Sequence, residues 1–210
     1  MRGKIFERRV RAMRLGLSVV IGIIAVGLFL CTTSEGREVP GESMYKTGPL
    51  KPRDSEATIK VGDKAPEFTL PAVSGEKVSL SHYRGKKNVA ISFVPAAWTP
   101  VCSQQWPGYN IAQELFEKNN TVLLGISVDN IPTLYAWTKE MGKLWFPVLA
   151  DFWPHGAVAR SYGVLRSDGV AERAVFVIDK DGVVRYVDIH DINQMPRLEE
   201  LMRVLEQLPK

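Results

Sequence analysis

The feature that most limits the folds this chain can adopt is an almost uninterrupted apolar run, which is followed by a turn and a helical stretch. Residues Asn88 to Val94 read Asn-Val-Ala-Ile-Ser-Phe-Val, which is typical of a strand covered on both faces. A helix is predicted over residues 99–118, and a second buried strand over Thr121 to Val128. Strand, helix and strand in this order predict an α/β fold.

The remaining predicted strands and helices, added to this unit, give the element order of a thioredoxin-like fold. We expect a central mixed β-sheet flanked by helices, with an N-terminal β extension made by two short strands around a Ser74-Gly75 turn. A hairpin and an amphipathic helix close the domain. In chain order the further predicted elements are strands at 68–70 and 78–80, a helix at 131–141, a strand at 146–149, a helical turn at 157–162, strands at 174–178 and 183–187, and a helix from Pro196 on.

The chain begins with a basic leader, residues 1–14, and an apolar segment, residues 15–31, that carries no charge. At about 1.5 Å per residue this segment spans most of a hydrocarbon layer about 30 Å thick. Because basic residues precede it and acidic ones follow, we expect a single-pass membrane anchor with the domain outside the cytoplasm. A lipoprotein signal acylated at Cys31 and a cleaved signal peptide remain alternatives.

Residues 32–60 are rich in Gly, Pro and charge and lack apolar periodicity, so they predict a flexible linker ahead of a domain at 61–210. The net charge of the whole chain is +4, and residues 1–14 contribute +5 of it, which leaves −1 on the rest. The basic character therefore belongs to the leader. Nothing in the domain predicts a nucleic-acid partner.

Cys102 is the only cysteine after Cys31, and it falls where the predicted strand gives way to a helix. A free cysteine thiol has a pKa of about 8.5 and reacts as its thiolate. Unpaired N–H groups and the helix dipole favour an anion at such a place. The alternative to a reactive cysteine is an inert cysteine in the hydrophobic core. The polar and turn-forming neighbours Thr99, Pro100 and Ser103 do not resemble a core segment.

The same stretch contains a motif. Residues 95–102 read Pro-Ala-Ala-Trp-Thr-Pro-Val-Cys, and this Pro-x-x-x-Thr-x-x-Cys sequence resembles the active-site motif of the peroxiredoxins, thiol peroxidases on a thioredoxin-like fold. Residues 149–164 and 173–179 resemble later blocks of that family. Within the first of these, residues 151–156 (Asp-Phe-Trp-Pro-His-Gly) are most similar to the one-cysteine alkyl hydroperoxide reductase E type. The resemblance covers residues 61–210.

The resemblance implies a role for each matched residue. Cys102 would be the peroxidatic cysteine, which attacks hydrogen peroxide or an organic hydroperoxide and becomes a sulfenic acid. Thr99 would hydrogen-bond the peroxide, and Pro95 would keep water from the thiolate. Arg173 would stabilise the thiolate and the leaving oxygen. Without the resemblance, Arg173 would read as a solvated arginine at a strand end.

The chain departs from the family pattern at two positions. Gln105 stands where many members have Glu, and an amide cannot hold an arginine as an ion pair. Pro107 stands where members with a nearby second cysteine often carry it. The sulfenic acid would therefore need an external thiol, from a redoxin or a small molecule. Trp98 and Gln105 are expected around the site, where they would contact the substrate or support the residues that do.

Two other functions compete with the peroxidase. A membrane-anchored thiol–disulfide oxidoreductase would need a cysteine where Thr99 stands, so dithiol exchange within one motif is excluded. A redox sensor shares the first chemical step and stays open. The three histidines are far apart in sequence, and we expect neither a metal nor another cofactor. The resemblance is compatible with a homodimer.

Overall fold

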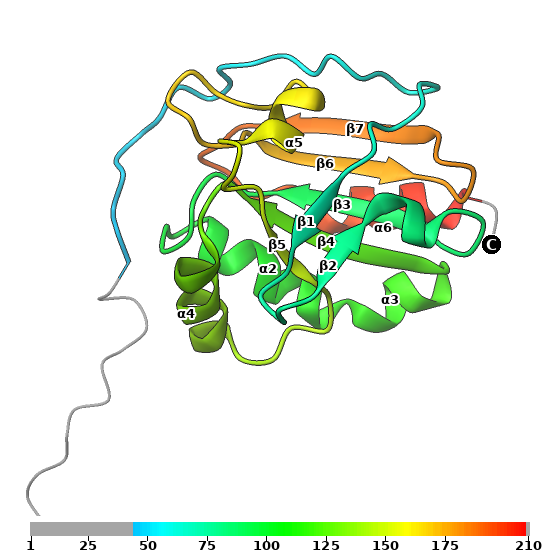
Figure 1. The fold of residues 1–210 in the computed structure, drawn as a ribbon, viewed down its shortest axis with the longest axis horizontal. Helices are drawn as coiled ribbons and strands as arrows, with labels where there is room; N and C mark the ends of the chain where they lie inside the picture. The colour runs from blue at the N-terminus through cyan, green and yellow to red at the C-terminus, as the bar shows by residue number, and fades with distance from the viewer. Residues whose placement is uncertain (1–43, 209–210) are drawn as a thin grey trace, which may run out of the picture. The chain divides into compact units, whose positions relative to one another are not determined.

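The computed structural model describes residues 44–208, and the leader and anchor predicted for residues 1–31 lie outside them, as does the first part of the linker. In chain order the elements are β1 (Thr69–Pro71), β2 (Lys77–Ser79), the 3-10 helix η1 (Leu80–Tyr83), β3 (Asn88–Phe93), α2 (Cys102–Ile111), α3 (Gln113–Lys118), β4 (Thr121–Ser127), α4 (Ile131–Met141), β5 (Val148–Ala150), α5 (Ala157–Ser161), β6 (Arg173–Ile178), β7 (Val184–His190) and α6 (Leu198–Glu206). A five-stranded sheet has the order β5-β4-β3-β6-β7, and β1 and β2 form a separate pair (Figure 1).

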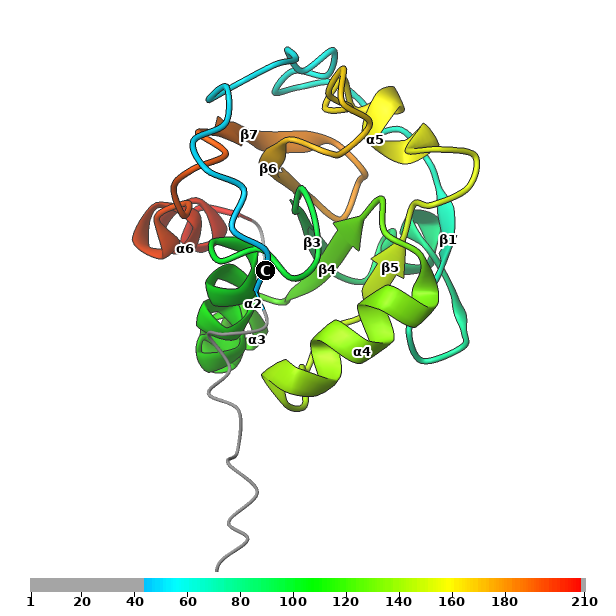
Figure 2. The same cartoon turned by 90° about the vertical axis from the view of Figure 1, so that its left-hand side faces the viewer.

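The strand β3 is the centre of the large sheet, and all six of its residues are buried. It pairs in parallel with β4 and antiparallel with β6, so the mixed sheet is confirmed. One face of the sheet is covered by α2, α3, α4 and α6, where Trp106 and Trp137 belong to one core cluster. The other face is covered by β1, η1 and α5, where Phe93 and Tyr162 pack together. Figure 2 shows α5 and β1 on the opposite side of the sheet from α2 and α4. Apolar surface is thus buried on both sides of β3, as its sequence predicts.

The single helix predicted over residues 99–118 is two helices in the structure. The first begins at Cys102, because Trp98 has a left-handed backbone (φ 61°) and residues 99–101 form the turn that leads into α2. Ala112 leaves helical geometry (φ −88°, ψ 13°) and separates α2 from α3. The apolar pattern continues across this break, which is why the sequence reads as one helix.

The strand β7 is longer than predicted, ending at His190 where the sequence suggested Val187. Its last residues are only partly buried, so they lack the apolar signal of an inner strand. The extension nevertheless pairs with β6 up to the register Arg173↔His190. It therefore carries the following loop to the start of β6, where that loop contacts Arg173.

Residues 44–60 lie along the domain, whereas the sequence predicted a flexible linker up to residue 60. In Figure 1 this segment crosses above β7 before it turns into β1. The segment packs closely against Gly163 (φ 73°), where a Cβ would lie only 2.3 Å from the backbone nitrogen of Thr58. The attachment is made largely by hydrogen bonds to the backbone, and these leave no apolar periodicity in the sequence.

Candidate active site

Cys102 is the first residue of α2, and its side chain is fully buried at 0% exposure. The sulfur lies at the N-terminus of a ten-residue helix, where free N–H groups and the helix dipole favour negative charge. The Nη2 atom of Arg173 donates a hydrogen bond to the Cys102 sulfur at 3.4 Å. The structure thus brings together the two residues on which the sequence analysis relied most, 71 positions apart in the chain.

Arg173, the first residue of β6, is a buried cation with only 1% exposure. Its guanidinium donates to the Oε1 atom of Gln105, and to the carbonyl oxygen of Ile192 from both Nε (3.2 Å) and Nη2 (3.0 Å). Within residues 44–208 no Asp or Glu side chain forms an ion pair with Arg173. The positive charge is therefore surrounded by neutral acceptors and by the Cys102 sulfur.

Gln105 lies one turn after Cys102 and holds Arg173 from the helix side. Its amide nitrogen donates to the Ser92 hydroxyl at 3.1 Å and to the Tyr109 hydroxyl at 3.4 Å. Burial raises the pKa of Tyr109 to about 12, which keeps this hydroxyl neutral. The orientation of the Gln105 amide follows, because its nitrogen faces two hydroxyls and its oxygen faces the guanidinium.

Pro95, Thr99 and Arg173 line one pocket of about 870 Å³. Pro95 is buried, and the Thr99 hydroxyl donates to the carbonyl oxygen of Ala96 at 3.0 Å, which leaves its lone pairs free to accept. Trp98 does not line this pocket. Its half-buried side chain packs against the core cluster that contains Cys102.

Several groups around Arg173 and Gln105 were not predicted from the sequence. Ile192 supplies a backbone carbonyl, which no side-chain pattern reveals. Ser92 is a polar residue inside an apolar run, and that interruption was a usable signal. The pocket also has a wall made by residues 45–50, which the sequence placed in the linker.

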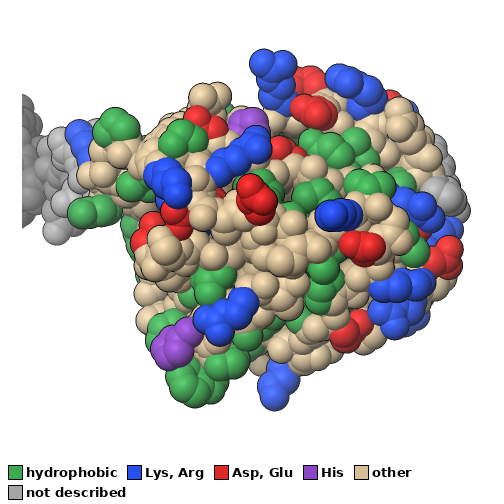
Figure 3. Space-filling view, turned by 90° about the horizontal axis from the view of Figure 1, so that it is seen from above, with side chains coloured by type: hydrophobic (Ala, Val, Ile, Leu, Met, Phe, Trp, Pro, Cys, Tyr) green, Lys and Arg blue, Asp and Glu red, His purple; other side chains and the backbone are tan. Residues whose placement is uncertain are grey.

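Within the described range, 44–208, no group of three or more His, Cys, Asp or Glu side chains could hold a metal ion. No helix of that range is long and apolar enough to cross a membrane. On the face shown in Figure 3, basic and acidic side chains are both spread over the surface rather than gathered by sign.

A thioredoxin-like sheet with one buried cysteine at a helix start, beside a buried arginine, is the arrangement of a cysteine-dependent oxidoreductase. Residues 61–187 match the model of the AhpC/TSA family. Alkyl hydroperoxide reductase E of Mycobacterium tuberculosis is 39% identical over 132 residues, which are 62% of this chain and 86% of the relative. The chloroplastic 2-Cys peroxiredoxin BAS1 of Hordeum vulgare is 36% identical over 158 residues, 70% of this chain and 74% of the relative.

Among solved structures, the reduced 2-Cys peroxiredoxin of Plasmodium vivax superimposes with a TM-score of 0.66 at 30% identity, covering 70% of this chain and 80% of that one. The chain therefore belongs to the AhpC/TSA family of peroxiredoxins, thiol-dependent peroxidases on a thioredoxin-like fold. Members of this family are often dimeric; for this chain a homodimer stays a prediction.

Proposed function

We propose that this chain reduces hydrogen peroxide and organic hydroperoxides, with Cys102 as the peroxidatic cysteine and an external thiol as the reductant. The observation that carries the proposal is the buried Arg173 guanidinium, 3.4 Å from the Cys102 sulfur and without a carboxylate partner among the described residues. A buried cation that lacks an opposite charge is costly. The thiolate, which is the reactive form of cysteine, supplies that charge.

Each catalytic cycle reduces one peroxide and oxidises two external thiols. The Cys102 thiolate attacks one peroxide oxygen, the O–O bond breaks, and the leaving oxygen takes a proton as water or an alcohol. The sulfur is oxidised to a sulfenic acid and the peroxide is reduced. An external thiol then displaces water from the sulfenic sulfur to form a mixed disulfide, and a second thiol releases Cys102 as a disulfide forms between the two reductants.

Three residues act on the peroxide beside Cys102. Arg173 reaches both the sulfur and the pocket, so its guanidinium stabilises the thiolate and the charge that develops on the leaving oxygen. The Thr99 hydroxyl accepts a hydrogen bond from the peroxide, and Pro95 keeps bulk water away. The Cys102 sulfur is fully buried and Cys102 does not line the pocket, so a peroxide in the pocket reaches the sulfur only after a local movement of the chain.

Gln105 and Trp98 act around this centre rather than on the substrate. Gln105 orients Arg173 through its oxygen, and because the amide is neutral it leaves the guanidinium charge available to the thiolate. The backbone of Trp98, in its left-handed conformation, sets the path of the loop into α2. Strained backbone of this kind concentrates at functional sites.

Turnover tests the proposal. With excess dithiothreitol, the full-length protein is expected to consume many equivalents of hydrogen peroxide per Cys102. Consumption of one equivalent followed by a stop would instead indicate the redox sensor, which shares only the first step. Membership of the peroxiredoxin family does not favour the alternative function of a membrane-anchored thiol–disulfide oxidoreductase.

The membrane attachment is proposed from the sequence alone, since residues 15–31 lie outside the described residues. The uncharged segment between a basic leader and acidic residues supports a single-pass anchor with the catalytic domain outside the cytoplasm. Sedimentation with the membrane fraction and an intact N-terminus in the mass spectrum are expected. A shortened or an acylated N-terminus at Cys31 would instead indicate a cleaved or a lipoprotein form.

A further inference from the structure

The segment Tyr45–Leu50 forms part of the active-site pocket. The pocket of about 870 Å³ is lined by this segment, by residues of the stretch from Pro95 to Val101, and by Arg173 and Ile192. The backbone N–H of Tyr45 donates to the carbonyl of Trp98 at 2.8 Å, which fixes one end of the segment to the active-site loop. The segment precedes residue 61, where the match to the family model begins.

The other end of the segment is held by the loop that follows β7. The Asn193 side chain pairs with both backbone groups of Leu50: it accepts from the Leu50 N–H at 3.0 Å and donates to the Leu50 carbonyl at 2.9 Å. The N–H of Ile192 donates to the carbonyl of Pro52 at 3.0 Å. Two neighbouring residues of the loop thus hold two positions of the N-terminal segment.

Ile192 is also the backbone acceptor of Arg173. Its carbonyl oxygen receives hydrogen bonds from two guanidinium nitrogens, and one of these, Nη2, donates as well to the Cys102 sulfur. The position of the Ile192 carbonyl therefore sets where the guanidinium lies relative to the sulfur. The contacts of Ile192 and Asn193 with the segment fix that carbonyl from both sides.

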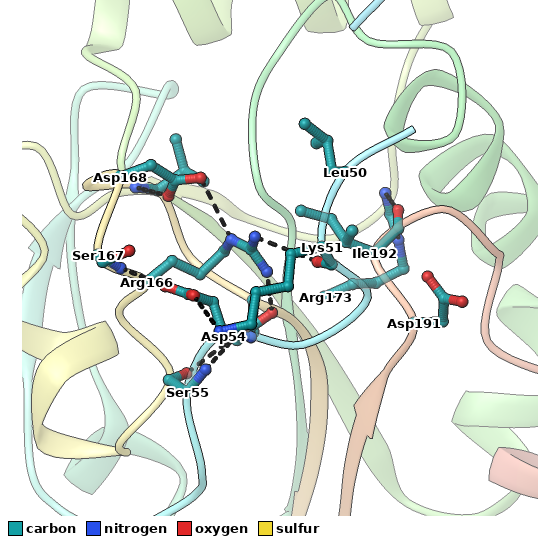
Figure 4. Close-up of polar contacts among 12 residues, drawn as sticks. Leu50, Lys51, Asp54, Ser55, Arg166, Ser167, Asp168, Arg173, Asp191 and Ile192 are labelled. Atoms are coloured by element: carbon teal, nitrogen blue, oxygen red, sulfur yellow. Dashed lines mark hydrogen bonds and ion pairs between the residues drawn. The ribbon is translucent and has the colours of Figure 1, made fainter. Parts of the chain in front are cut away.

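A second attachment lies next to Arg173 in the chain. The buried Glu172 accepts from the backbone N–H groups of Asp54 (2.6 Å) and Ser55 (2.7 Å), and forms an ion pair with Arg166 at 2.9 Å. Arg166 in turn donates to the carbonyl of Lys51 at 3.2 Å (Figure 4). The segment is thus tied to the start of β6 as well as to the loop after β7.

We propose that residues 45–55, the pocket-lining segment together with the residues that attach it to the domain, belong to the active site. Asn193 is a positioning residue for Arg173. The segment and Asn193 hold the Ile192 carbonyl, and this carbonyl holds the guanidinium against the Cys102 sulfur. The inference rests on the proposed peroxidase function, in which Arg173 stabilises the thiolate. It extends the catalytic unit beyond the part of the chain that matches the family.

The chain offers a matched control for Asn193. The Asn110 side chain makes the same kind of pair, donating to the carbonyl of Lys143 and accepting from the N–H of Trp145, both at 3.1 Å. Asn193→Ala and Asn110→Ala in the full-length protein each remove two side-chain hydrogen bonds to the backbone of another segment, and Asn193→Ala also removes the bond from its amide to the Asp191 carboxylate at 2.8 Å. Asn110 lies two turns beyond Cys102 on α2, but among the described residues its side chain bonds only to Lys143 and Trp145, whereas Asn193 adjoins Ile192, the acceptor of Arg173. Only the loss of Asn193 is therefore expected to displace the guanidinium and change the chemistry of Cys102.

Two measurements report on that chemistry. One is the pH dependence of Cys102 alkylation by iodoacetamide, read on the Cys102 peptide by mass spectrometry. The other is the rate of thiol loss with hydrogen peroxide in the absence of reductant. For Asn193→Ala we expect the alkylation profile to move to higher pH and the peroxide rate to fall about tenfold, because small displacements of catalytic groups are costly. Asn110→Ala is expected to keep both wild-type values.

A second pair of variants tests the segment itself. Gly48 has φ +67° and nothing within 4 Å of a Cβ, so the methyl group of Gly48→Ala meets no neighbouring atom, while the substitution strains the backbone of the segment. Gly75 shares these properties (φ +90°) in the turn between β1 and β2, far from residue 193 in the chain. Gly48→Ala is expected to shift both measurements in the same direction as Asn193→Ala, and Gly75→Ala to shift neither.

Wild-type values for both Asn193→Ala and Gly48→Ala, with a slow Arg173→Ala, would overturn the inference and leave the proposed function intact. Equal effects of Asn193→Ala and Asn110→Ala would also overturn it, since general destabilisation would then explain both. A wild-type rate for Arg173→Ala would overturn the inference together with the proposed role of Arg173.

Discussion

Replacement of Cys102 by Ser is expected to abolish the thiol-dependent consumption of hydrogen peroxide. The exchange of sulfur for oxygen changes the buried side chain little in size, so the fold is expected to survive. A serine hydroxyl, however, does not ionise near neutral pH and offers Arg173 no anion. The rate with excess dithiothreitol should fall to that of the buffer alone, measured as the disappearance of hydrogen peroxide.

The control for this variant is the other cysteine of the chain. Cys31→Ser removes a thiol but leaves Cys102 in place, and it is expected to keep the wild-type rate. Circular dichroism should show the same secondary structure for both variants and the wild type. Residual turnover by Cys102→Ser would mean that the assignment of the peroxidatic residue is wrong.

Replacement of Arg173 by Ala is expected to slow the reaction with hydrogen peroxide by about 10²- to 10³-fold, the usual cost of removing a preorganised donor to developing charge. The variant loses the hydrogen bond to the Cys102 sulfur and the only charged group that contacts it among the described residues. The alkylation profile of Cys102 should therefore move to higher pH. Stopped-flow measurement of thiol oxidation checks the rate.

Two further arginine variants separate charge from geometry. Arg185, on β7, is ion-paired with Asp179 at 2.6 Å and is 45% exposed, so Arg185→Ala should leave the rate unchanged. Arg173→Lys keeps the charge but loses the fork of donors that reaches Gln105, Ile192 and the sulfur at once. It should recover part of the loss. A wild-type rate in Arg173→Ala would show that this residue has only a structural role.

The fold could be predicted from the sequence because its elements carry strong apolar patterns. The helix α4 has the bounds that its periodicity predicted, helped by Pro132 near its start and an Asn130 cap. The inner strand β3 was likewise predicted to within one residue, because burial on both faces leaves a continuous apolar run. The break between α2 and α3 was not predicted, since the pattern runs through it.

The site was predictable only in part. Cys102 stood out by its place after β3, but nothing in the spacing pairs it with Arg173. Their proximity comes from the antiparallel register of β3 and β6, in which Phe93 lies opposite Ala174. The resemblance to a family supplied that pairing. The segment from Tyr45 and the Asn193 contact had no such guide, because single hydrogen bonds between distant residues follow no periodic pattern.

The complete enclosure of the Cys102 sulfur has a consequence for the choice of electron donor. In the proposed function the donor has to reach this sulfur past the pocket wall formed by residues 45–50 and residues of the stretch 95–101. We therefore expect a slender donor, either a low-molecular-weight thiol or a cysteine on a narrow protruding loop, to restore the enzyme faster than a protein whose thiol lies on a broad flat surface.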